Sequence, residues 1–218
     1  MTVIMETPLM VVRQRSVGPW DNNVFMITAG DSGEQILVDA ADDTPAILEL
    51  IESAREDGPD PRVVLIMTTH SHEDHIEALA DMVHTTKART AAGREDASAI
   101  EDHTGVKIEV LVDHGSMIEI AGLSLSVISL RGHTPGSVAL VYQEENQPTL
   151  ILTGDSLFPG GVGNTDQDPQ RFTSLFTDVT TRIFDVYSDD TIIWPGHGTS
   201  TTLGKERPHL QEWYKRGW

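Results

Sequence analysis

The eight residues from Thr68 to His75, Thr-Thr-His-Ser-His-Glu-Asp-His, constrain the fold of this chain more than any other segment. They follow Arg62–Met67, whose apolar residues predict a buried strand, and precede Ile76–Val83, whose apolar spacing predicts a helix. Three imidazoles and two carboxylates are therefore crowded into a strand-to-helix turn, where a rigid scaffold often holds functional residues.

This pattern favours metal binding. His70 and His72 alternate by two, so an extended backbone directs both imidazoles to one side. Neutral imidazole is the commonest metal ligand and suits zinc, iron and copper. Asp74 and His75 lie where the chain starts to curl and can face a second point nearby. The alternative is a polar loop whose histidines are solvated and whose Asp74 caps the helix. That alternative would prevail for one histidine, but the combined pattern predicts a metal site.

Four further residues stand at predicted strand ends or in glycine-containing turns. His133 lies in Arg-Gly-His-Thr-Pro-Gly-Ser, Asp155 in Leu-Thr-Gly-Asp-Ser, and His197 in Trp-Pro-Gly-His-Gly. Glycine beside a ligand lets the backbone approach closely. Each histidine alone is more commonly structural, but together they supply the number of ligands that a two-metal site needs. Asp39, at a predicted strand end, fits a carboxylate orienting a ligand imidazole and an ordinary strand-end aspartate equally well.

Composition limits the classes of partner. A length of 218 residues fits one domain with a sizeable core. The formal net charge of −19 argues against binding nucleic acid or an anionic lipid surface, both of which need a basic footprint. The absence of cysteine excludes disulfides, thiolate nucleophiles and cysteine-bound zinc. We therefore expect a small-molecule substrate, no nucleic-acid or membrane partner, and an oligomeric state that the sequence does not indicate.

The N-terminal residues 1–8 lack the basic segment and the long apolar run of a secretory signal. No uninterrupted apolar stretch approaches membrane-spanning length. The absence of disulfides fits a reducing compartment. These features predict a cytoplasmic protein.

Strands and helices are predicted in an order that indicates a layered fold. Strands are expected over residues 9–17 (as an edge strand), 22–29, 35–39, 62–67, 88–92, 108–112, 116–120, 123–130, 137–143, 149–153 and 191–194, and helices over 44–56, 75–84, 93–100, 170–186 and 203–213. Two groups of strands, with helices between and after them, predict two sheets with helices outside. The predicted fold class is a single α/β layered domain over residues 1–218.

The motif H-x-H-x-D-H, followed by a distant His, Asp and His, resembles the metallo-β-lactamase superfamily of hydrolases. This resemblance covers Thr68 to Gly198 and implies an αββα sandwich with its site at one edge between the sheets. It implies that His70, His72 and His133 hold one metal, that Asp74, His75 and His197 hold the other, and that Asp155 bridges them. His84, His103, His114 and His209 match nothing in the pattern and are expected to be surface or structural residues.

Within the superfamily, residues 132–137 and 152–163 are most similar to glyoxalase II, and the short chain after His197 is similar to its small, single-domain forms. The larger forms carry a helical C-terminal domain that holds much of the glutathione. The resemblance implies two divalent ions, zinc first, with iron or manganese as alternatives. It implies a metal-bound hydroxide that attacks the thioester or ester carbonyl of a hydroxyacylglutathione-type substrate. Asp74, as a proton relay, and Asp155, as the bridge, are the expected catalytic residues.

Several alternatives stay open. A persulfide dioxygenase with one iron at His70, His133 and Asp155 would use the same fold, and lactonases and β-lactamases are further hydrolytic options. A serine hydrolase is suggested by Gly-Asp-Ser-Leu at 154–157, although this string is mid-chain and lacks a matching Asp-x-x-His. A non-catalytic metal-binding fold is the remaining alternative. The glycine-rich segment 159–168 is predicted either to rim the pocket or to be an ordinary loop.

Overall fold

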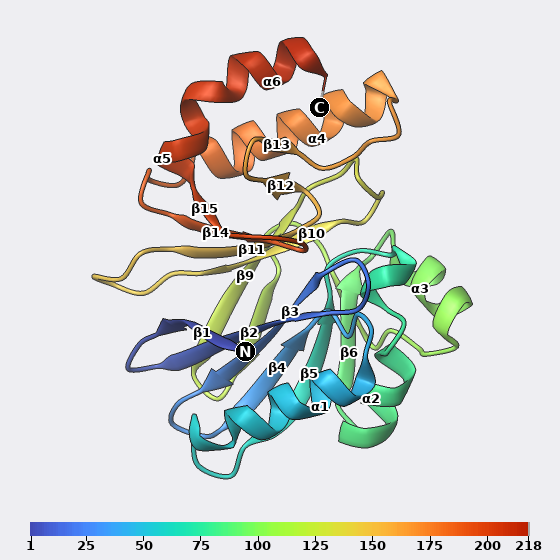
Figure 1. The fold of residues 1–218 in the computed structure, drawn as a ribbon, viewed down its shortest axis with the longest axis vertical. Helices are drawn as coiled ribbons and strands as arrows, with labels where there is room; N and C mark the ends of the chain where they lie inside the picture. Colours follow the sequence, from blue (N-terminus) through green and yellow to red (C-terminus); the bar gives the residue numbers. More distant parts are fainter. Residues whose placement is uncertain (218) are drawn as a thin grey trace.

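Two β-sheets pack face to face in the computed structural model, which describes residues 1–217 (Figure 1). The first sheet has seven strands in the order β1-β2-β3-β4-β5-β6-β7. These are β1 (Thr2–Glu6), β2 (Met10–Val17), β3 (Asn22–Ala29), β4 (Glu34–Val38), β5 (Arg62–Thr68), β6 (Arg89–Gly93) and β7 (Val110–Val112). The second sheet has six strands in the order β15-β14-β11-β10-β9-β8. These are β8 (Met117–Ile120), β9 (Leu123–Ser129), β10 (Val138–Tyr142), β11 (Leu150–Gly154), β14 (Ile192–Pro195) and β15 (Thr201–Thr202), and a separate hairpin pairs β12 (Leu157–Phe158) with β13 (Gly161–Val162).

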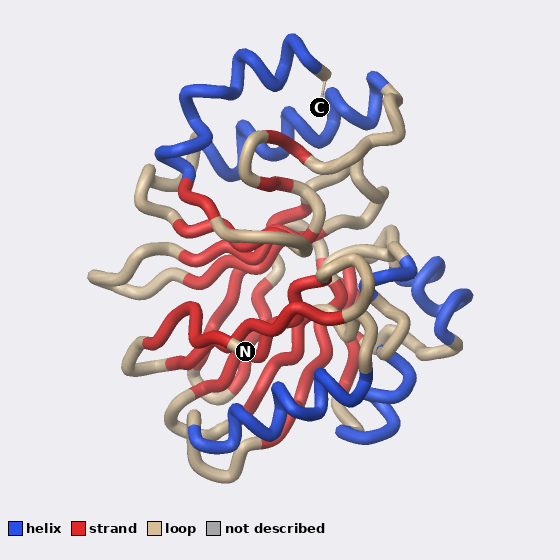
Figure 2. The backbone as a smooth tube through the Cα atoms, viewed as in Figure 1, coloured by secondary structure: helices blue, strands red, loops and turns tan. Residues whose placement is uncertain are grey.

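Helices lie on the outer face of each sheet (Figure 2). The first sheet is covered by α1 (Thr44–Ser53), α2 (Leu79–Thr86) and α3 (Ala97–Thr104). The second sheet is covered by α4 (Pro169–Val179), which continues as a π-helical segment over Thr180–Phe184, and by α5 (Leu203–Glu206) and α6 (Leu210–Arg216). Short 3₁₀ segments occupy Ala54–Glu56, Glu73–His75 and Arg207–His209.

Three apolar clusters hold these four layers together. The central cluster lies between the sheets and includes Phe25, Met67 and Leu140. A second joins the first sheet to α1, α2 and α3, and a third joins the second sheet to α4 and α6, where Trp213 is buried. Because each sheet buries both faces, its central strands are almost continuously apolar rather than alternating. The architecture is therefore an αββα sandwich, which confirms the predicted layered α/β fold.

Strand direction places many loops at one edge of the sandwich. Strands β4, β5, β6 and β7 are parallel neighbours connected through α1, α2 and α3, so their carboxyl ends meet at the same edge. Strands β11 and β14 in the second sheet are also parallel. In open α/β sheets, ligands bind outside the carboxyl ends of such strands. The sequence cluster at Thr68–His75 lies at this edge, immediately after β5.

Some predicted boundaries were wrong. The strand predicted over residues 9–17 is not an edge strand, because β2 pairs with β3 on one side and with the unpredicted β1 on the other. The helix predicted over 75–84 begins only at Leu79, since the backbone of Ile76 leaves helical geometry after the 3₁₀ turn. The helix predicted over 170–186 changes to π-helical geometry at Thr180, and the one over 203–213 is divided into three short segments.

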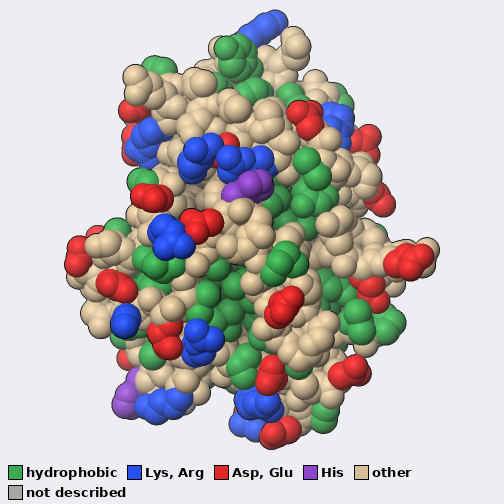
Figure 3. Space-filling model, turned by 180° about the vertical axis from the view of Figure 1, so that it is seen from behind, with side chains coloured by type: hydrophobic (Ala, Val, Ile, Leu, Met, Phe, Trp, Pro, Cys, Tyr) green, Lys and Arg blue, Asp and Glu red, His purple; other side chains and the backbone are tan. Residues whose placement is uncertain are grey.

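The surface carries mixed charges on the face seen from behind, where Lys and Arg side chains lie among Asp and Glu side chains (Figure 3). Hydrophobic side chains are visible across the middle of this face. Among the described residues, none of the helices has the length and apolar character needed to cross a membrane.

Candidate metal centre

The structure brings together all seven residues that the sequence analysis assigned to metal binding. His70, His72, Asp74 and His75 follow β5, and His133 lies between β9 and β10. Asp155 follows β11, and His197 follows β14. Each of them therefore lies beyond the carboxyl end of a strand, and the two sheets contribute residues to a common site.

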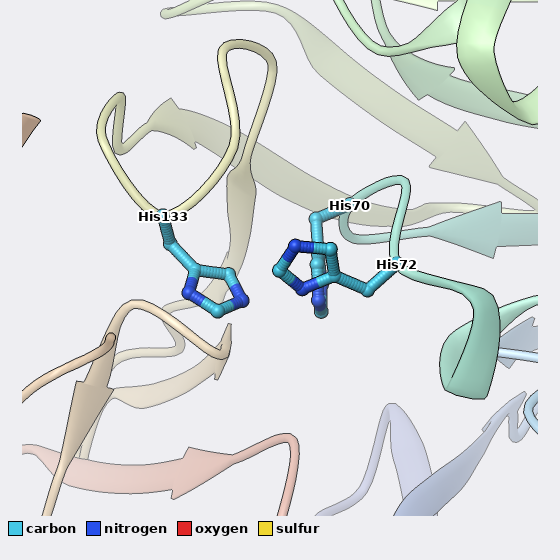
Figure 4. Close-up of side chains that lie close together, drawn as sticks. All are labelled: His70, His72 and His133. Atoms are coloured by element: carbon cyan, nitrogen blue, oxygen red, sulfur yellow. The ribbon is translucent and has the colours of Figure 1, made fainter. Parts of the chain in front are cut away.

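The first half-site consists of His70, His72 and His133. One ring nitrogen from each lies within 4.8 Å of those of the other two. The three rings converge from two separate loops, with His70 and His72 on one side and His133 on the other (Figure 4). The ring centroids of His72 and His133 are 4.4 Å apart and nearly perpendicular. Such a set presents three nitrogen donors to one point.

The second half-site consists of Asp74, His75 and His197. The Nε2 atom of His197 lies 3.2 Å from Asp74 Oδ2 and 3.2 Å from His75 Nε2. The imidazole of His75 is fully buried, whereas Asp74 and His197 are partly exposed. This set combines two imidazoles with a carboxylate.

Asp155 lies between the two half-sites. Its Oδ2 is 3.7 Å from His133 Nε2 and 3.3 Å from His197 Nε2, and its Oδ1 is 3.6 Å from His75 Nε2. One carboxylate therefore faces histidines of both sets. Gly196, next to His197, makes this approach possible, because a Cβ atom there would lie 2.2 Å from Asp155 Oδ1.

Four histidines are oriented through their outer ring nitrogen. His75 Nδ1 donates to Asp39 at 2.9 Å, His133 Nδ1 to the carbonyl of Asn164 at 2.7 Å, and His197 Nδ1 to the carbonyl of Trp20 at 2.8 Å. His70 Nδ1 donates to Thr69 Oγ1 at 3.0 Å, and this hydroxyl donates to Asp39 at 2.8 Å. Each inner Nε2 is thereby left facing the centre, which is the arrangement that ligand histidines adopt in metal sites.

Asp39 orients two of these histidines. It is 1% exposed and accepts hydrogen bonds from the backbone and hydroxyl of Thr69 and from His75. Although Asp39, His70 and His75 also group closely, Asp39 faces the Nδ1 side of both rings. The structure therefore supports the orienting role over that of an ordinary strand-end aspartate.

The two half-sites differ in their electrostatics. Burial lowers the pKa of His70 well below its usual value of 6.5, and the neighbouring histidines lower it further. Burial also dominates the lowered pKa of His133. In the second half-site burial acts in the same direction on His197, but hydrogen bonds with Asp155 and Asp74 outweigh it and raise the pKa of His197 to about 10.

The pKa values of the two carboxylates, Asp74 and Asp155, are lowered by their contacts with these histidines. The hydrogen bond from His197 is the main cause of the lowered pKa of Asp74. Burial would raise the pKa of Asp155, but His197, His75 and His133 outweigh it and lower that pKa. Without metal, His70 and His133 are therefore held neutral, while the second half-site is an ion-paired group of imidazolium and carboxylate.

Unpartnered polar atoms at the centre fit a bound cation. His70 Nε2, His133 Nε2 and Asp155 Oδ1 are buried and have no hydrogen-bond partner among the described residues. Buried polar atoms are seldom left unpaired, and clusters of them deserve an explanation. Nitrogen and carboxylate donors converging on two adjacent points suit divalent zinc, iron or manganese. The residues present thus fit two metal ions.

Sequence reasoning missed several supporting residues. Asn22 donates to Asp74 at 2.8 Å, Thr69 connects Asp39 with His70, and the carbonyls of Trp20 and Asn164 hold two histidines. Backbone carbonyls leave no sequence signal. The adjacent polar residues Asn22 and Asn23, at the start of an otherwise apolar strand, were a usable signal.

Two of the histidines that matched nothing in the sequence pattern lie beside glutamates outside the seven-residue site. His103 sits on the surface, 3.6 Å from Glu73, and His209 lies 3.8 Å from Glu212. Ser156, the nucleophile required by the serine-hydrolase alternative, is fully buried, and its hydroxyl has no hydrogen-bond partner among the described residues. A serine nucleophile needs an adjacent base, so the geometry disfavours that alternative.

One cavity is lined by two of the candidate ligands, and a second is lined by Asn164, whose carbonyl holds His133. The first, of about 720 Å³, is lined by Pro19, Trp20, Asn22, Asp42, Glu73, Asp74, Glu77 and His197, and is therefore acidic. The other, of about 1000 Å³, lies between α4, α6 and the segment after β13. Its lining includes Asn164, which holds His133, together with Phe172, Tyr214, Lys215 and Arg216. Part of the glycine-rich segment 159–168 thus lines this second cavity, whose walls include none of the seven candidate ligands.

The sequence model described as the metallo-beta-lactamase superfamily matches residues 17–197. The chain therefore belongs to the metallo-β-lactamase superfamily, whose members are generally metal-dependent hydrolases that bind divalent metals. Hydroxyacylglutathione hydrolase GloC of Haemophilus influenzae is 25% identical over 81% of this chain and 86% of its own length.

Solved structures show the same fold. The crystal structure of the BLEG-1 B3 metallo-beta-lactamase matches with a TM-score of 0.74 and 26% identity, covering 91% of this chain and 97% of that one. ETHE1 from Myxococcus xanthus matches with a TM-score of 0.78 and 23% identity, covering 94% and 85%. TTHA1623, solved in a di-iron-bound form, matches with a TM-score of 0.68 and 27% identity, covering 89% and 96%.

Proposed function

We propose that this protein is a dinuclear-metal hydrolase that cleaves a thioester or ester carbonyl, with a hydroxyacylglutathione-type thioester as the substrate class. The observation that carries the proposal is the pair of half-sites with Asp155 between them. The first half-site would hold one divalent ion through His70, His72 and His133. The second would hold another through Asp74, His75 and His197, and zinc is the metal proposed first.

The shape of the surroundings supports a thioester with a bulky anionic part. The cavity lined by Asn164 offers aromatic side chains from Phe172 and Tyr214 and the cationic side chain of Lys215, beside the helix-capping carboxylate of Asp168. The cavity beside His197 is lined by carboxylates and repels anions. A peptide-like carboxylate carrier such as glutathione is therefore proposed to lie on the side of α4 and α6. The similarity to GloC supports the same substrate class.

The residues of the site have different roles in the proposed reaction. Divalent ions held there supply Lewis acidity that polarises a carbonyl and lowers the pKa of water. Asp74 is partly exposed at the edge of the acidic cavity, which allows it to take a proton from the centre and pass it to solvent. Asp39 and Asn22 fix the orientation of His75 and Asp74, so neither needs to reorganise during the reaction.

Metal content and substrate range test the proposal together. Elemental analysis of the purified protein should give about two divalent ions per chain, and S-lactoylglutathione should be hydrolysed faster than lactones or β-lactams. Chelation should abolish this activity, and added metal should restore it. Activity that survives removal of all metal would contradict the proposal.

A mononuclear-iron persulfide dioxygenase is the second candidate. The fold similarity to ETHE1 is compatible with it, and the first half-site with Asp155 offers enough ligands for one iron. This candidate would give about one iron per chain and oxygen uptake with glutathione persulfide, without thioester hydrolysis. The complete second half-site favours the dinuclear hydrolase.

A further inference from the structure

Asp96 is a buried carboxylate at the edge of the site that lies outside the seven proposed ligands. It follows β6, is 1% exposed and stands immediately before α3. An aspartate in this position commonly caps its own helix. The side chain of Asp96 makes no such bond, so its carboxylate is available to other segments.

Three donors from two distant loops converge on this carboxylate. Its Oδ2 accepts from the backbone N–H of Ser71 at 2.9 Å and from Thr134 Oγ1 at 2.5 Å. Its Oδ1 accepts from the backbone N–H of Gly136 at 2.7 Å. Gly136 is closely packed here, since a Cβ atom would lie 2.4 Å from the Asp96 nitrogen.

These donors belong to the loops that carry the first half-site. Ser71 lies between His70 and His72, and Thr134 directly follows His133. One loop extends from the first sheet and the other from the second, so nothing in the local sequence sets their separation. The buried carboxylate of Asp96 joins both loops, beside a direct backbone hydrogen bond from Val138 N–H to the carbonyl of Thr69 at 2.9 Å.

The second half-site is supported by different groups. Asp39 holds His75, Asn22 holds Asp74, and the carbonyl of Trp20 holds His197. None of these bonds involves Asp96. Loss of the Asp96 carboxylate should therefore disturb one set of three ligands and spare the other.

We propose that Asp96 is a positioning residue that sets the distance between His133 and the His70–His72 pair, and thereby the metal affinity of the first half-site alone. This inference rests on the proposed function, in that both half-sites are taken to bind divalent ions. Replacing a group that holds metal ligands in position through hydrogen bonds typically lowers metal affinity about 10- to 100-fold. Asp96→Asn should fall in this range, because the amide keeps the shape but can no longer accept from all three donors.

Zinc titration of the metal-free protein against a competing chelator tests the assignment. In a His197→Ala background, which reports the first half-site, Asp96→Asn should lower zinc affinity about 10- to 100-fold. In a His133→Ala background, which reports the second, the same change should have little effect. Asp57→Asn is the matched control, because Asp57 is a largely buried carboxylate paired with Arg13 and outside the site's hydrogen bonds.

A readout without metal separates structural damage from positioning. Asp96→Asn should shift the histidine ring nitrogen NMR signals of His72 and His133 and leave those of His75 and His197 in place. If Asp96→Asn does not fold, Thr134→Val removes one of the three bonds at nearly constant volume and should give the same selectivity with a smaller change.

The outcomes are distinguishable. Equal losses at both half-sites, or no loss at either in a zinc-binding wild type, would overturn the positioning role while leaving the proposed function intact. A folded wild type that binds no zinc at all would overturn both.

Discussion

The two half-sites use the same side chain, histidine, in opposite electrostatic settings. The rings of His70 and His75 are only 4.2 Å apart between centroids, yet the pKa of His70 is lowered and that of His75 is raised. Burial opposes the charged form of both. His75 differs because its hydrogen bond to Asp39 and the nearby charges of Asp155 and Asp74 outweigh that burial.

This difference shows that the partner of an imidazole, rather than its depth, decides its charge. In the first half-site, His70 and His133 are neutral donors already suited to a cation. The second is an ion-paired set from which a metal has to displace protons before it can bind. The two are expected to fill with different pH dependence, although they lie side by side.

Asp155→Ala is expected to have the largest effect, because this carboxylate faces histidines of both half-sites. The variant should lose bound metal at both positions and lose thioester hydrolysis on the order of 1000-fold or more, as is typical for groups that act as a unit. Steady-state kinetics and elemental analysis on the same sample measure the two losses. Full activity with two ions retained would defeat the assignment of Asp155, and the same result for His72→Ala would defeat that of the first half-site.

The next largest effect should be a difference between the two half-sites in how zinc affinity depends on pH. In a His133→Ala variant, zinc binds through the second half-site and must displace the proton of His197, whose pKa is raised to about 10. Zinc affinity should therefore rise about tenfold per pH unit for each proton displaced between pH 6.5 and 8.5. In a His197→Ala variant, zinc binds through the first half-site, where lowered pKa values leave no proton on His70 or His133, and affinity should rise less steeply with pH.

Chelator-competition titrations at a series of pH values provide this measurement, with His84→Ala as a control that alters an exposed histidine outside the site. Parallel slopes for the two variants would show that the half-sites do not differ in charge.

The ligand cluster could be predicted from the sequence because most of it is local. His70, His72, Asp74 and His75 fall within six residues, and a strand followed by a helix fixes their direction. The role of Asp39 was left open, because no local signal shows that β4 lies next to β5. The support from Asp96 depends on contacts with residues 25 and 40 positions away, so only the folded chain reveals it.

The predicted ends of helices and strands were wrong where tertiary contacts, rather than the local sequence pattern, determine the backbone conformation. The chain from Thr2 to Glu6 becomes a strand because β2 offers it an unpaired edge, which periodicity cannot indicate. The start of α2 is delayed to Leu79, since the N–H of Ala78 is bonded to carbonyls of Ala40 and Ala41 across the loop. Both errors lie next to correctly predicted elements, so the predicted order of layers is still correct.

The smallest expected effect is on the thermal stability of the metal-free protein. The second half-site should change this stability at alkaline pH, and the first half-site should change it at acid pH. His197 and His75 have raised pKa values, so their contribution is complete below about 6.5 and is lost as pH rises toward 10. His70 and His133 have lowered pKa values, so protonation of the unfolded chain costs stability as pH falls below 6.5.

Thermal unfolding of the protein in chelator measures both effects. The unfolding temperature should have a maximum near pH 6.5 and fall by roughly 2–6 °C by pH 9.5. His197→Gln should reduce the alkaline decline and leave the decline from about pH 6.5 to 5 unchanged, whereas an unaltered alkaline decline would show that the ion pairs of the second half-site do not stabilise the fold.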